Sequence, residues 1–465
     1  MGQPQLLLRR VAHPAVGLAD VVCRDGVVES VSSHREDLAE RGAIVALDCA
    51  GGRLIPGLTD HHVHLMAWAA ALESVDLSRG DVDSQSDLLP LAAAPVDSSG
   101  WVRATGYRER FDRLPRTGEL DDVRSDVPVR IQHVSGAVWL LNTTAVDHLA
   151  RTEEGAELLE RDAVGRPTGR IWRRDEDLAR ILPVRKLALD RVGESLSRHG
   201  VTAVVDATPG DRDLGSIVDA RGSGALPQRV TVMTAQAPAD ESVALGPLKL
   251  VLEEHALPPI AELVETIRRA RADERAVAVH CVTRVELQFA VTALEQAPAL
   301  AGSRVEHGGV ITPDDIPRLR ALGLTVVTQP GFIAARGDHY LDDVDPDDLP
   351  HLYRQRSLRD AGIPLLLSSD APFGPSNPWE IIDAACRRRT PSGHVIGACE
   401  RLTPDEALTC FMGGSAGALV VAEGMPADLV VLRPDADVGQ ESEPVMLTVV
   451  AGDVVYRREN PGPTR

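Results

Sequence analysis

Short apolar runs alternate with amphipathic segments through the middle of the chain. Eight runs rich in β-branched and other apolar residues have the length and composition of strands: 58–65, 201–207, 229–235, 247–253, 276–282, 304–309, 324–330 and 364–372. The segments between them, such as PPIAELVETIRRARADE, have the apolar spacing of helices. Strands that are apolar on both faces and separated by helices are typical of a parallel sheet.

Eight parallel strands separated by helices is the arrangement that closes a (β/α)8 barrel. We therefore predict an α/β fold, a TIM barrel over residues 56–420. The stretch between the first and second predicted strands is far too long for a βα loop and carries strand-like runs at 101–107 and 127–136. We predict that residues 68–190 form a long insertion after strand 1 that covers the barrel mouth.

Both ends of the chain have a different pattern, with strands and tight turns but no helical spacing. Apolar runs flank Asp25-Gly26, which is a hairpin signature, and Gly452-Asp453 marks another turn near the far end. We predict a small β-sandwich domain assembled from residues 1–55 and 421–465, with the barrel inserted between its two parts.

Composition narrows the class of protein. The chain of 465 residues is 43% hydrophobic, enough for a large core, and its 49 basic residues against 69 acidic ones give a net charge of −20. This charge argues against a nucleic-acid or anionic-membrane partner. The six cysteines form no C-x-x-C pair, and we find neither a secretory leader pattern nor a transmembrane run. We expect a cytoplasmic protein with a small-molecule substrate, and a homodimer remains open.

Only two of the basic residues are lysines, Lys186 and Lys249. Where arginine has replaced lysine almost everywhere, a retained lysine can serve a purpose that arginine cannot, although skewed codon usage explains chance survivors equally well. Lys186 lies on a connector and fits the second explanation. Lys249 lies inside the predicted fourth strand, where an unpaired cation is costly to bury. An ion pair with Glu253 or Glu254, or an outward side chain, is the alternative.

The strongest local motif is Asp60-His61-His62-Val63-His64 at the end of the first predicted strand. Residues two apart on a strand point to the same face, so His62 and His64 project together and His61 points the other way. Two imidazoles side by side suit a divalent metal such as Zn²⁺. Asp60 is placed either to orient a metal ligand or simply to make a turn.

Other predicted strands end in similar chemistry. His280 ends strand five, His307 ends strand six and Asp370 ends strand eight. Barrel active sites lie at the C-terminal ends of the strands, so these side chains are expected to meet those of the first strand. Further candidates are substrate-binding: Arg284 for a substrate carboxylate, and Trp68, His133 and Gln329 as lining of the mouth, with solvated or packing roles as the alternatives.

Several phrases of the chain resemble the amidohydrolase superfamily of metal-dependent hydrolases, in the branch that includes N-substituted formamide deformylases. They are LIPGLTDHHVHL, RVEHGG, SSDAPF, LTPDEAL and GMPADLVVL, and the resemblance covers nearly the whole chain. The chain departs from that branch in the insertion, where Ala137 and Arg173 stand at positions that usually carry His and Glu. The deformylase substrate is therefore not carried over.

The resemblance implies a set of roles. His62 and His64 would bind the more buried metal, and His280 and His307 the second metal, or one of them would serve a mononuclear site. Lys249, carboxylated by CO₂, would bridge two metals, which the guanidinium of an arginine cannot do. Asp370 would bind a metal or its water and take the proton from that water.

These observations predict a metal-dependent hydrolase that cleaves an amide-type C–N bond with a metal-activated water and Asp370 as general base. The implied cofactor is one or two Zn²⁺ ions, with Mn²⁺ or Fe²⁺ as alternatives. One alternative function is a deaminase or cyclic-amide hydrolase with a mononuclear metal site. A second is a non-catalytic barrel that serves as a binding module.

Overall fold

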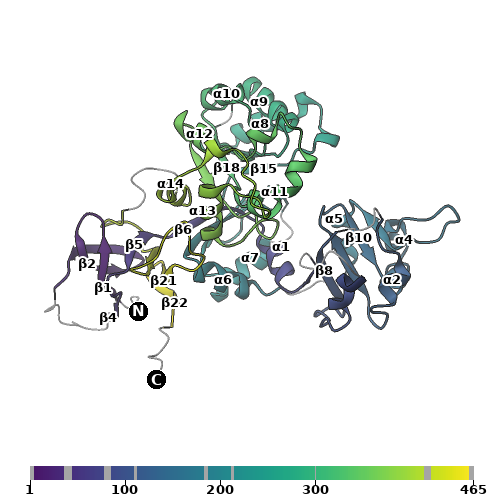
Figure 1. Ribbon diagram of the computed structural model, residues 1–465, viewed down its shortest axis with the longest axis horizontal. Coiled ribbons are helices and arrows are strands. Elements are labelled where there is room, and N and C mark those ends of the chain that lie inside the picture. The colour runs from purple at the N-terminus through teal and green to yellow at the C-terminus, as the bar shows by residue number, and fades with distance from the viewer. Residues whose placement is uncertain are drawn as a thin grey trace. The chain divides into compact units, whose positions relative to one another are not determined.

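The computed structural model describes residues 5–35, 44–77, 85–108, 113–182, 187–210, 214–298, 300–412 and 420–459. The chain divides into two compact units, one made of Met1–Leu65 with Leu189–Arg465 and the other of Met66–Ala188 (Figure 1). The insertion at 68–190, its place over a barrel mouth and the separate terminal domain stay predictions. Lys186 lies outside the described residues.

The two ends of the chain build one eight-stranded sheet in the first unit. Its strands are β1 (Gln5–His13), β2 (Gly17–Arg24), β3 (Val27–Ser33), β4 (Ile44–Asp48), β5 (Arg53–Pro56), β20 (Leu429–Leu432), β21 (Val445–Val450) and β22 (Asp453–Arg457). They follow the order β22-β21-β20-β5-β1-β2-β3, with β4 paired to β1. The described strands thus form a single sheet, and its organisation as a two-sheet sandwich stays a prediction.

Turn chemistry explains how this sheet folds back on itself. Asp25 and Gly26, between β2 and β3, have φ of +50° and +76°, the conformation that a tight hairpin turn requires. The turn between β21 and β22 is made by Ala451 and Gly452, and Asp453 already belongs to β22, one residue away from the predicted turn. The buried face of the sheet brings together apolar residues from both chain ends, including Leu8, Val21 and Val449.

Each of the eight expected barrel strands contains an observed strand, and all of their pairings are parallel. They lie in two separate sheets of order β14-β13-β12-β6 and β15-β16-β17-β18-β19. With the additional strand β14, the strands of these two sheets are β6 (Leu58–Val63), β12 (Val201–Asp206), β13 (Arg229–Val232), β14 (Val243–Leu245), β15 (Leu248–Leu250), β16 (Val277–Cys281), β17 (Arg304–His307), β18 (Thr325–Thr328) and β19 (Leu365–Leu367).

The strand β14 was not expected, and its separation from β15 has a local cause. Gly246 and Pro247 stand between the two strands, and a proline has no N–H to donate to a ladder. β14 therefore pairs with β13, and after the interruption β15 pairs with β16. At this point the chain passes from the first of these two sheets to the second, and Lys249 lies in the middle of β15.

Helices follow most of these strands, as the alternating pattern predicts. They are α6 (Leu189–Arg198), α7 (Leu214–Ser223), α8 (Ile260–Ala272), α9 (Arg284–Gln296), α10 (Asp315–Ala321), α11 (Gly331–Asp343), α12 (Arg356–Asp360), α13 (Pro378–Arg387) and α14 (Pro404–Cys410), with short 3-10 turns at Glu254–Ala256, Leu349–His351 and Ala398–Glu400. Capping boxes fix two of the starts: Thr283 with Glu286 at α9, and Thr403 with Glu406 at α14. The first of these caps sets where the chain leaves β16, just after His280.

The second unit has its own sheet and core. Its elements are β7 (Val75–Asp76), the 3-10 helix Gln85–Leu91, β8 (Val102–Tyr107), α2 (Thr117–Asp121), β9 (Val129–His133), β10 (Val138–Leu141), α3 (Thr143–Leu149), α4 (Glu153–Leu158), β11 (Arg170–Trp172) and α5 (Asp175–Ile181), and α1 (Leu65–Leu72) spans the boundary with the first unit. The sheet order is β11-β10-β9-β8-β7. Ala137 and Arg173, the two departures from the family pattern, face each other here, because Arg173 N donates to Ala137 O at 2.9 Å.

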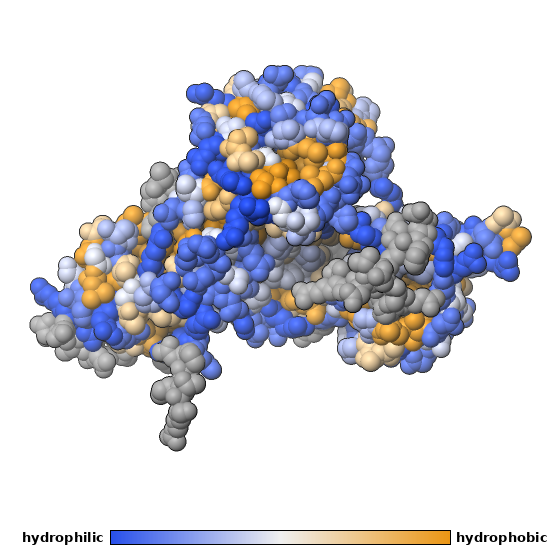
Figure 2. Space-filling model, in the orientation of Figure 1, coloured by the Kyte–Doolittle hydropathy of each residue, from blue (hydrophilic) through white to orange (hydrophobic). Residues whose placement is uncertain are grey.

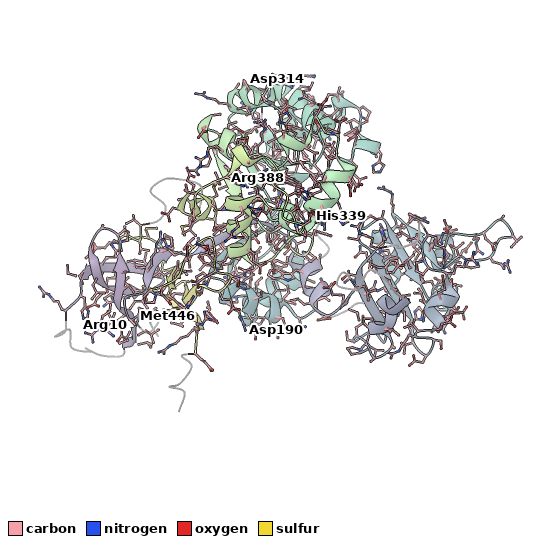
Figure 3. The ribbon with its side chains drawn as sticks, viewed as in Figure 1. Arg10, Asp190, Asp314, His339, Arg388 and Met446 are labelled. Atoms are coloured by element: carbon pink, nitrogen blue, oxygen red, sulfur yellow. The ribbon has the colours of Figure 1, made fainter. Side chains whose placement is uncertain are left out.

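The surface agrees with the acidic composition. Figure 2 shows hydrophilic residues over most of the visible face, with smaller hydrophobic areas between them. Not every charged side chain lies at the surface. Arg388 (Figure 3) is fully buried, and its guanidinium donates to the carbonyl oxygens of Leu352, Tyr353 and Ile396. No helix among the described residues is both long and apolar enough to cross a membrane.

Candidate metal centre

The end of β6 and the segment after β19 are joined by backbone hydrogen bonds that carry the candidate ligands. Asp370 N donates to His62 O at 2.8 Å, and His64 N donates to Ala371 O at 3.0 Å. Asp370 has φ of +53°, a conformation that costs energy for a residue other than glycine and that is concentrated at functional sites. These contacts place the carboxylate of Asp370 opposite the two imidazoles.

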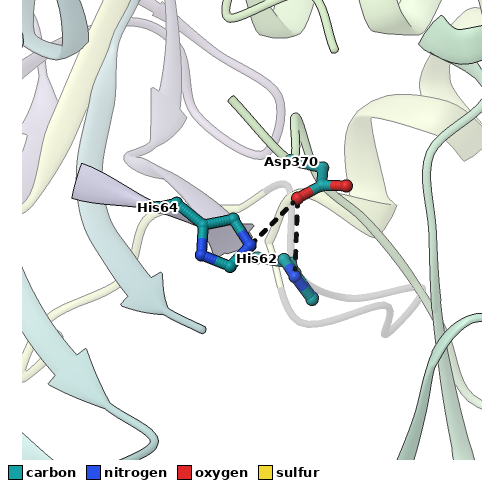
Figure 4. A group of neighbouring side chains, drawn as sticks. All are labelled: His62, His64 and Asp370. Carbon is teal, nitrogen blue, oxygen red and sulfur yellow. Dashed lines mark ion pairs between the residues drawn. The ribbon is translucent and has the colours of Figure 1, made fainter. Parts of the chain in front are cut away.

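Three side chains converge there. His64 Nε2 lies 3.3 Å and His62 Nε2 lies 3.6 Å from Asp370 Oδ1 (Figure 4). One ligand atom of each of the three residues lies within 4.8 Å of the others. Asp370 Oδ1 is buried and accepts no hydrogen bond among the described residues. Burial, together with nearby cations, holds the pKa of His62 well below its usual value. Two imidazoles that face a buried carboxylate oxygen without a donor fit a divalent cation.

His280 and His307 form the opposite side of the centre. Their ring centroids are 4.5 Å apart, and the ring of His307 lies 4.7 Å from that of His62. His307 Nδ1 is 3.7 Å from Asp370 Oδ2. Burial lowers the pKa of His280 to about 4 and that of His307 well below its ordinary value, so both imidazoles are neutral at pH 7.

Lys249 points into this cluster from β15. Its Nζ lies 3.5 Å from His62 Nε2, and its side chain is buried. The alternative, an ion pair with Glu253 or Glu254, has no counterpart in the structure of the described residues. Burial lowers the pKa of Lys249, and the carboxylates of Glu306 and Asp370 oppose that shift. The lysine thus stands among the predicted ligands.

Glu306 and Arg304 belong to the site although the sequence analysis did not single them out. Both come from β17 and are buried, Glu306 completely. Glu306 Oε2 is hydrogen-bonded to His62 Nδ1, and Glu306 Oε1 accepts from Arg304 Nε. Two charged residues two positions apart on a buried strand were the available signal, because such groups are rarely buried unless paired.

His307 comes next on β17 and should face away from Glu306, since strand side chains alternate. Its φ of +68° breaks the extended conformation, so that two successive residues both contact the cluster. His307 Nδ1 lies 3.0 Å from Gln329 Oε1, and Gln329 Nε2 donates to Ser368 Oγ at 2.9 Å. Gln329, expected at the mouth, is buried beside a candidate ligand.

Two further polar groups hold the β6 end in place. Thr208 Oγ1 lies 3.2 Å from His64 Nδ1. The carboxylate of Asp206 accepts from Leu65 N at 2.8 Å and from Thr208 N at 3.0 Å. Neither residue was singled out in the sequence, where Asp206 falls at the end of a predicted strand and Thr208 just after it. They link the ends of β12 and β6.

Asp60 connects the end of β6 with the segment after β19. Its carboxylate accepts from Ser369 N at 3.0 Å and from His62 N at 3.3 Å, as well as from the Ser369 hydroxyl. Burial raises the pKa of Asp60 to about 6. Asp60 therefore contacts the backbone of a candidate ligand, not its imidazole.

The remaining predicted substrate contacts are not brought to the cluster by any contact of the described residues. Arg284 Nη1 lies 3.1 Å from Asp348 Oδ1, in an ion pair at the start of α9. Trp68, buried in α1, and His133, the last residue of β9, belong to the second unit. Their roles stay predictions.

Phe373 is an apolar group beside the cluster that the sequence analysis passed over. Its ring meets the ring of His64 edge-on at 5.5 Å between centroids, and its side chain is nearly half exposed. Arg336 Nη2 donates to Phe373 O at 2.7 Å, and its guanidinium lies over the ring of Phe332 at 5.0 Å. An exposed aromatic ring thus lies against a candidate metal ligand.

Comparisons with known proteins identify the family of this chain. The model of the amidohydrolase family matches residues 45–456. The chain is 22% identical to the putative amidohydrolase YtcJ of Bacillus subtilis, over 94% of this chain and 96% of that protein. It is 26% identical to an N-substituted formamide deformylase of Arthrobacter pascens, over 89% and 90% of the two chains.

Solved structures show the same fold. An uncharacterized metal-dependent hydrolase from Pyrococcus furiosus superposes with a TM-score of 0.73 at 22% identity, over 94% of this chain and all of that one. N-isopropylammelide isopropylaminohydrolase from Burkholderia multivorans gives a TM-score of 0.54 at 15% identity, over 98% and 100%. Because the family model covers most of its length, this chain belongs to the amidohydrolase family and is a hydrolase.

Proposed function

We propose that this chain is a metal-dependent hydrolase that cleaves an amide-type C–N bond. The observation that carries the proposal is the convergence of His62, His64 and Asp370, with ligand atoms within 4.8 Å of one another, in a member of the amidohydrolase family. The name of the Arthrobacter relative describes removal of a formyl group from N-substituted formamides, which is hydrolysis of such a bond.

His62, His64 and Asp370 would hold the first metal. Zn²⁺ accepts nitrogen and oxygen ligands of this kind, and Mn²⁺ or Fe²⁺ would also fit. A divalent metal bound there would lower the pKa of a coordinated water to about 7 and polarise the substrate carbonyl. The chain's own contribution is to hold the imidazoles of His62 and His64 and the side chain of Asp370 in fixed positions before the substrate arrives.

Asp370 is the proposed general base and acid. Its Oδ1 accepts no hydrogen bond among the described residues, so a lone pair is free for a water proton, and the group is buried against the two imidazoles. The same carboxyl would then donate that proton to the nitrogen of the departing amine. Groups that move a proton in this way contribute about 10²–10⁴-fold to a rate.

Lys249 is the proposed carrier of a carbamate. Its neutral amine would attack the carbon of CO₂ and lose a proton to solvent water, which leaves a carbamate whose single negative charge is shared by two oxygens beyond Nζ. Burial, which lowers the pKa of Lys249, favours the neutral amine that this addition requires. The carbamate oxygens would serve a second metal position together with His280 and His307, whose rings are in contact.

We also infer that the two parallel sheets close into one barrel. The backbone hydrogen bonds from Asp370 N to His62 O and from His64 N to Ala371 O support contact of the segment after β19 with β6. Lys249 N donates to Met233 O, just after β13, at 3.4 Å. The ends of the strands then form one rim around the cluster, as the barrel architecture requires.

Reconstitution tests the proposed function. The protein is stripped of metal, incubated with Zn²⁺ or Mn²⁺ and bicarbonate, and assayed for amine release from a panel of linear amides that includes N-substituted formamides. We expect release that depends on metal and that disappears in Asp370→Asn but persists in Asp435→Asn, an exposed carboxylate of the same unit. Metal that stays substoichiometric after this treatment, or equal turnover by the stripped protein, contradicts the proposal.

A further inference from the structure

A buried ion pair reaches from β17 to the strand that carries His62. Glu306 is fully buried and Arg304 is almost so. Arg304 Nε donates to Glu306 Oε1, and Arg304 Nη2 donates to His61 O at 2.7 Å. The second carboxylate oxygen, Oε2, meets His62 Nδ1. One strand therefore contacts both the backbone before His62 and the imidazole of His62 itself.

This pair is a costly way to gain stability. Burying two charges loses their hydration, and a buried ion pair is on that account weak evidence of a stabilising role. The two residues are two apart on β17, so their side chains lie on one face of that strand. The arrangement instead holds one acceptor oxygen of Glu306 against Nδ1 of His62.

A neutral imidazole carries its proton on one nitrogen and a lone pair on the other. A carboxylate beside Nδ1 favours the proton there, which leaves the lone pair on Nε2. His62 Nε2 is the nitrogen that faces the centre, 3.6 Å from Asp370 Oδ1 and 3.5 Å from Lys249 Nζ. Arg304 occupies Oε1 of Glu306 and so leaves Oε2 to His62.

We propose that Glu306 is a positioning residue that fixes His62 as the Nδ1-protonated tautomer, with Nε2 ready to bind a metal, and that Arg304 holds Glu306 in place for this. The inference rests on the proposed function in one respect only, the metal on Nε2. The tautomer itself is a property of the metal-free chain.

The first test needs neither metal nor activity. Long-range ¹H–¹⁵N spectra of the metal-free protein, labelled with ¹⁵N-histidine, distinguish a protonated Nδ1 from a protonated Nε2, and a His62→Asn variant assigns the signals. We expect His62 with its proton on Nδ1. A proton on Nε2 of His62 in the wild-type chain would overturn the inference.

The second test uses Glu306→Gln, which keeps the shape of the side chain. Arg304 can only donate, so it retains the amide oxygen, and the amide nitrogen then faces His62. Because that nitrogen donates, Nδ1 must accept and the proton moves to Nε2. We expect this reversed tautomer, and Zn²⁺ affinity, measured by competition with a chromophoric chelator, lower by about 10–100-fold.

Glu400→Gln is the matched control. Glu400 is also buried, faces Arg354 at 3.3 Å and accepts from Ser357 N, and it contacts no candidate ligand. We expect this variant to lower the melting temperature while His62 and Zn²⁺ affinity stay as in the wild type. Unchanged Zn²⁺ affinity in Glu306→Gln, or an equal loss in Glu400→Gln, would overturn the positioning role. A wild-type chain that binds none of Zn²⁺, Mn²⁺ and Fe²⁺ refutes the proposed function instead, and the spectra still decide the tautomer.

Discussion

The two sides of the candidate centre are built differently. On the β6 side, His62 and His64 have Nδ1 against Glu306 and Thr208 and turn Nε2 toward Asp370. On the opposite side, His280 and His307 are in ring contact, and both the ring of His307 and the amine of Lys249 lie close to His62.

This contrast shows which side of the centre has a set of metal-binding atoms without any modification of the chain. The β6 side already offers two imidazole nitrogens and a carboxyl oxygen to one cation. The opposite side offers imidazoles and an amine, with no contact to a further carboxylate besides Asp370 recorded among the described residues, and a carbamate on Lys249 would supply additional oxygens. The proposed function therefore predicts that substitutions on the two sides change metal content and activity to different extents.

The largest effect is expected from Asp370→Asn. The amide keeps the shape of the side chain but loses the charge and the capacity to carry a proton. We expect kcat to fall by about 10²–10⁴-fold, the range for a group that transfers a proton in the transition state. Steady-state amide hydrolysis measures it, and activity within threefold of wild type would remove Asp370 from the chemistry.

His64→Asn and His280→Asn compare the two sides directly. His64 lies in the cluster with Asp370, so its loss should empty the first metal position and abolish nearly all turnover. His280→Asn should remove only the second metal. Elemental analysis after reconstitution gives the metal content of each variant, and equal losses from both would show that the two sides are one site.

Lys249→Ala and Lys249→Arg test the bridging carbamate. Neither variant can form it, so both should bind about one metal fewer per chain and lose activity by about 10²-fold, or about 2.7 kcal/mol of barrier. A bicarbonate requirement in the wild type that is absent in both variants would support the role. Nearly full activity of Lys249→Ala argues for a mononuclear centre.

The smallest effect is expected from Phe373→Ala. The exposed ring lies against His64 and is not a metal ligand, so its removal should raise KM for amides with an apolar substituent while kcat and metal content stay the same. A tenfold change in KM, about 1.4 kcal/mol, is an upper expectation for lost apolar contact. A fall in metal content instead would show that Phe373 supports the metal centre.

The strands of the two parallel sheets were predictable because buried parallel strands leave continuous apolar runs, and each of the eight runs contains a strand. The His62 and His64 pair was predictable for the same reason of strand geometry. The interruption at Gly246-Pro247 was visible as residues but not as a change of pairing partner, because pairing depends on strands distant in sequence.

Glu306 shows what the sequence could not supply. Alternation along β17 separates Glu306 from His307, and only the positive φ of His307 allows both to contact the cluster. A left-handed residue that is not glycine leaves no sequence signal. Gln329 was expected to line the barrel mouth and lies buried against His307. Whether a polar side chain is buried depends on its partner, here 22 residues away in the sequence, which a local pattern does not reveal.

Diffraction data from crystals of the reconstituted protein, collected on both sides of the zinc absorption edge, test the central claim most directly. The account predicts an anomalous peak within bonding distance of His62 Nε2, His64 Nε2 and Asp370, with a second peak toward His280 and His307 if Lys249 is carboxylated. Full occupancy of zinc elsewhere on the chain, with no peak between His62, His64 and Asp370, would contradict it.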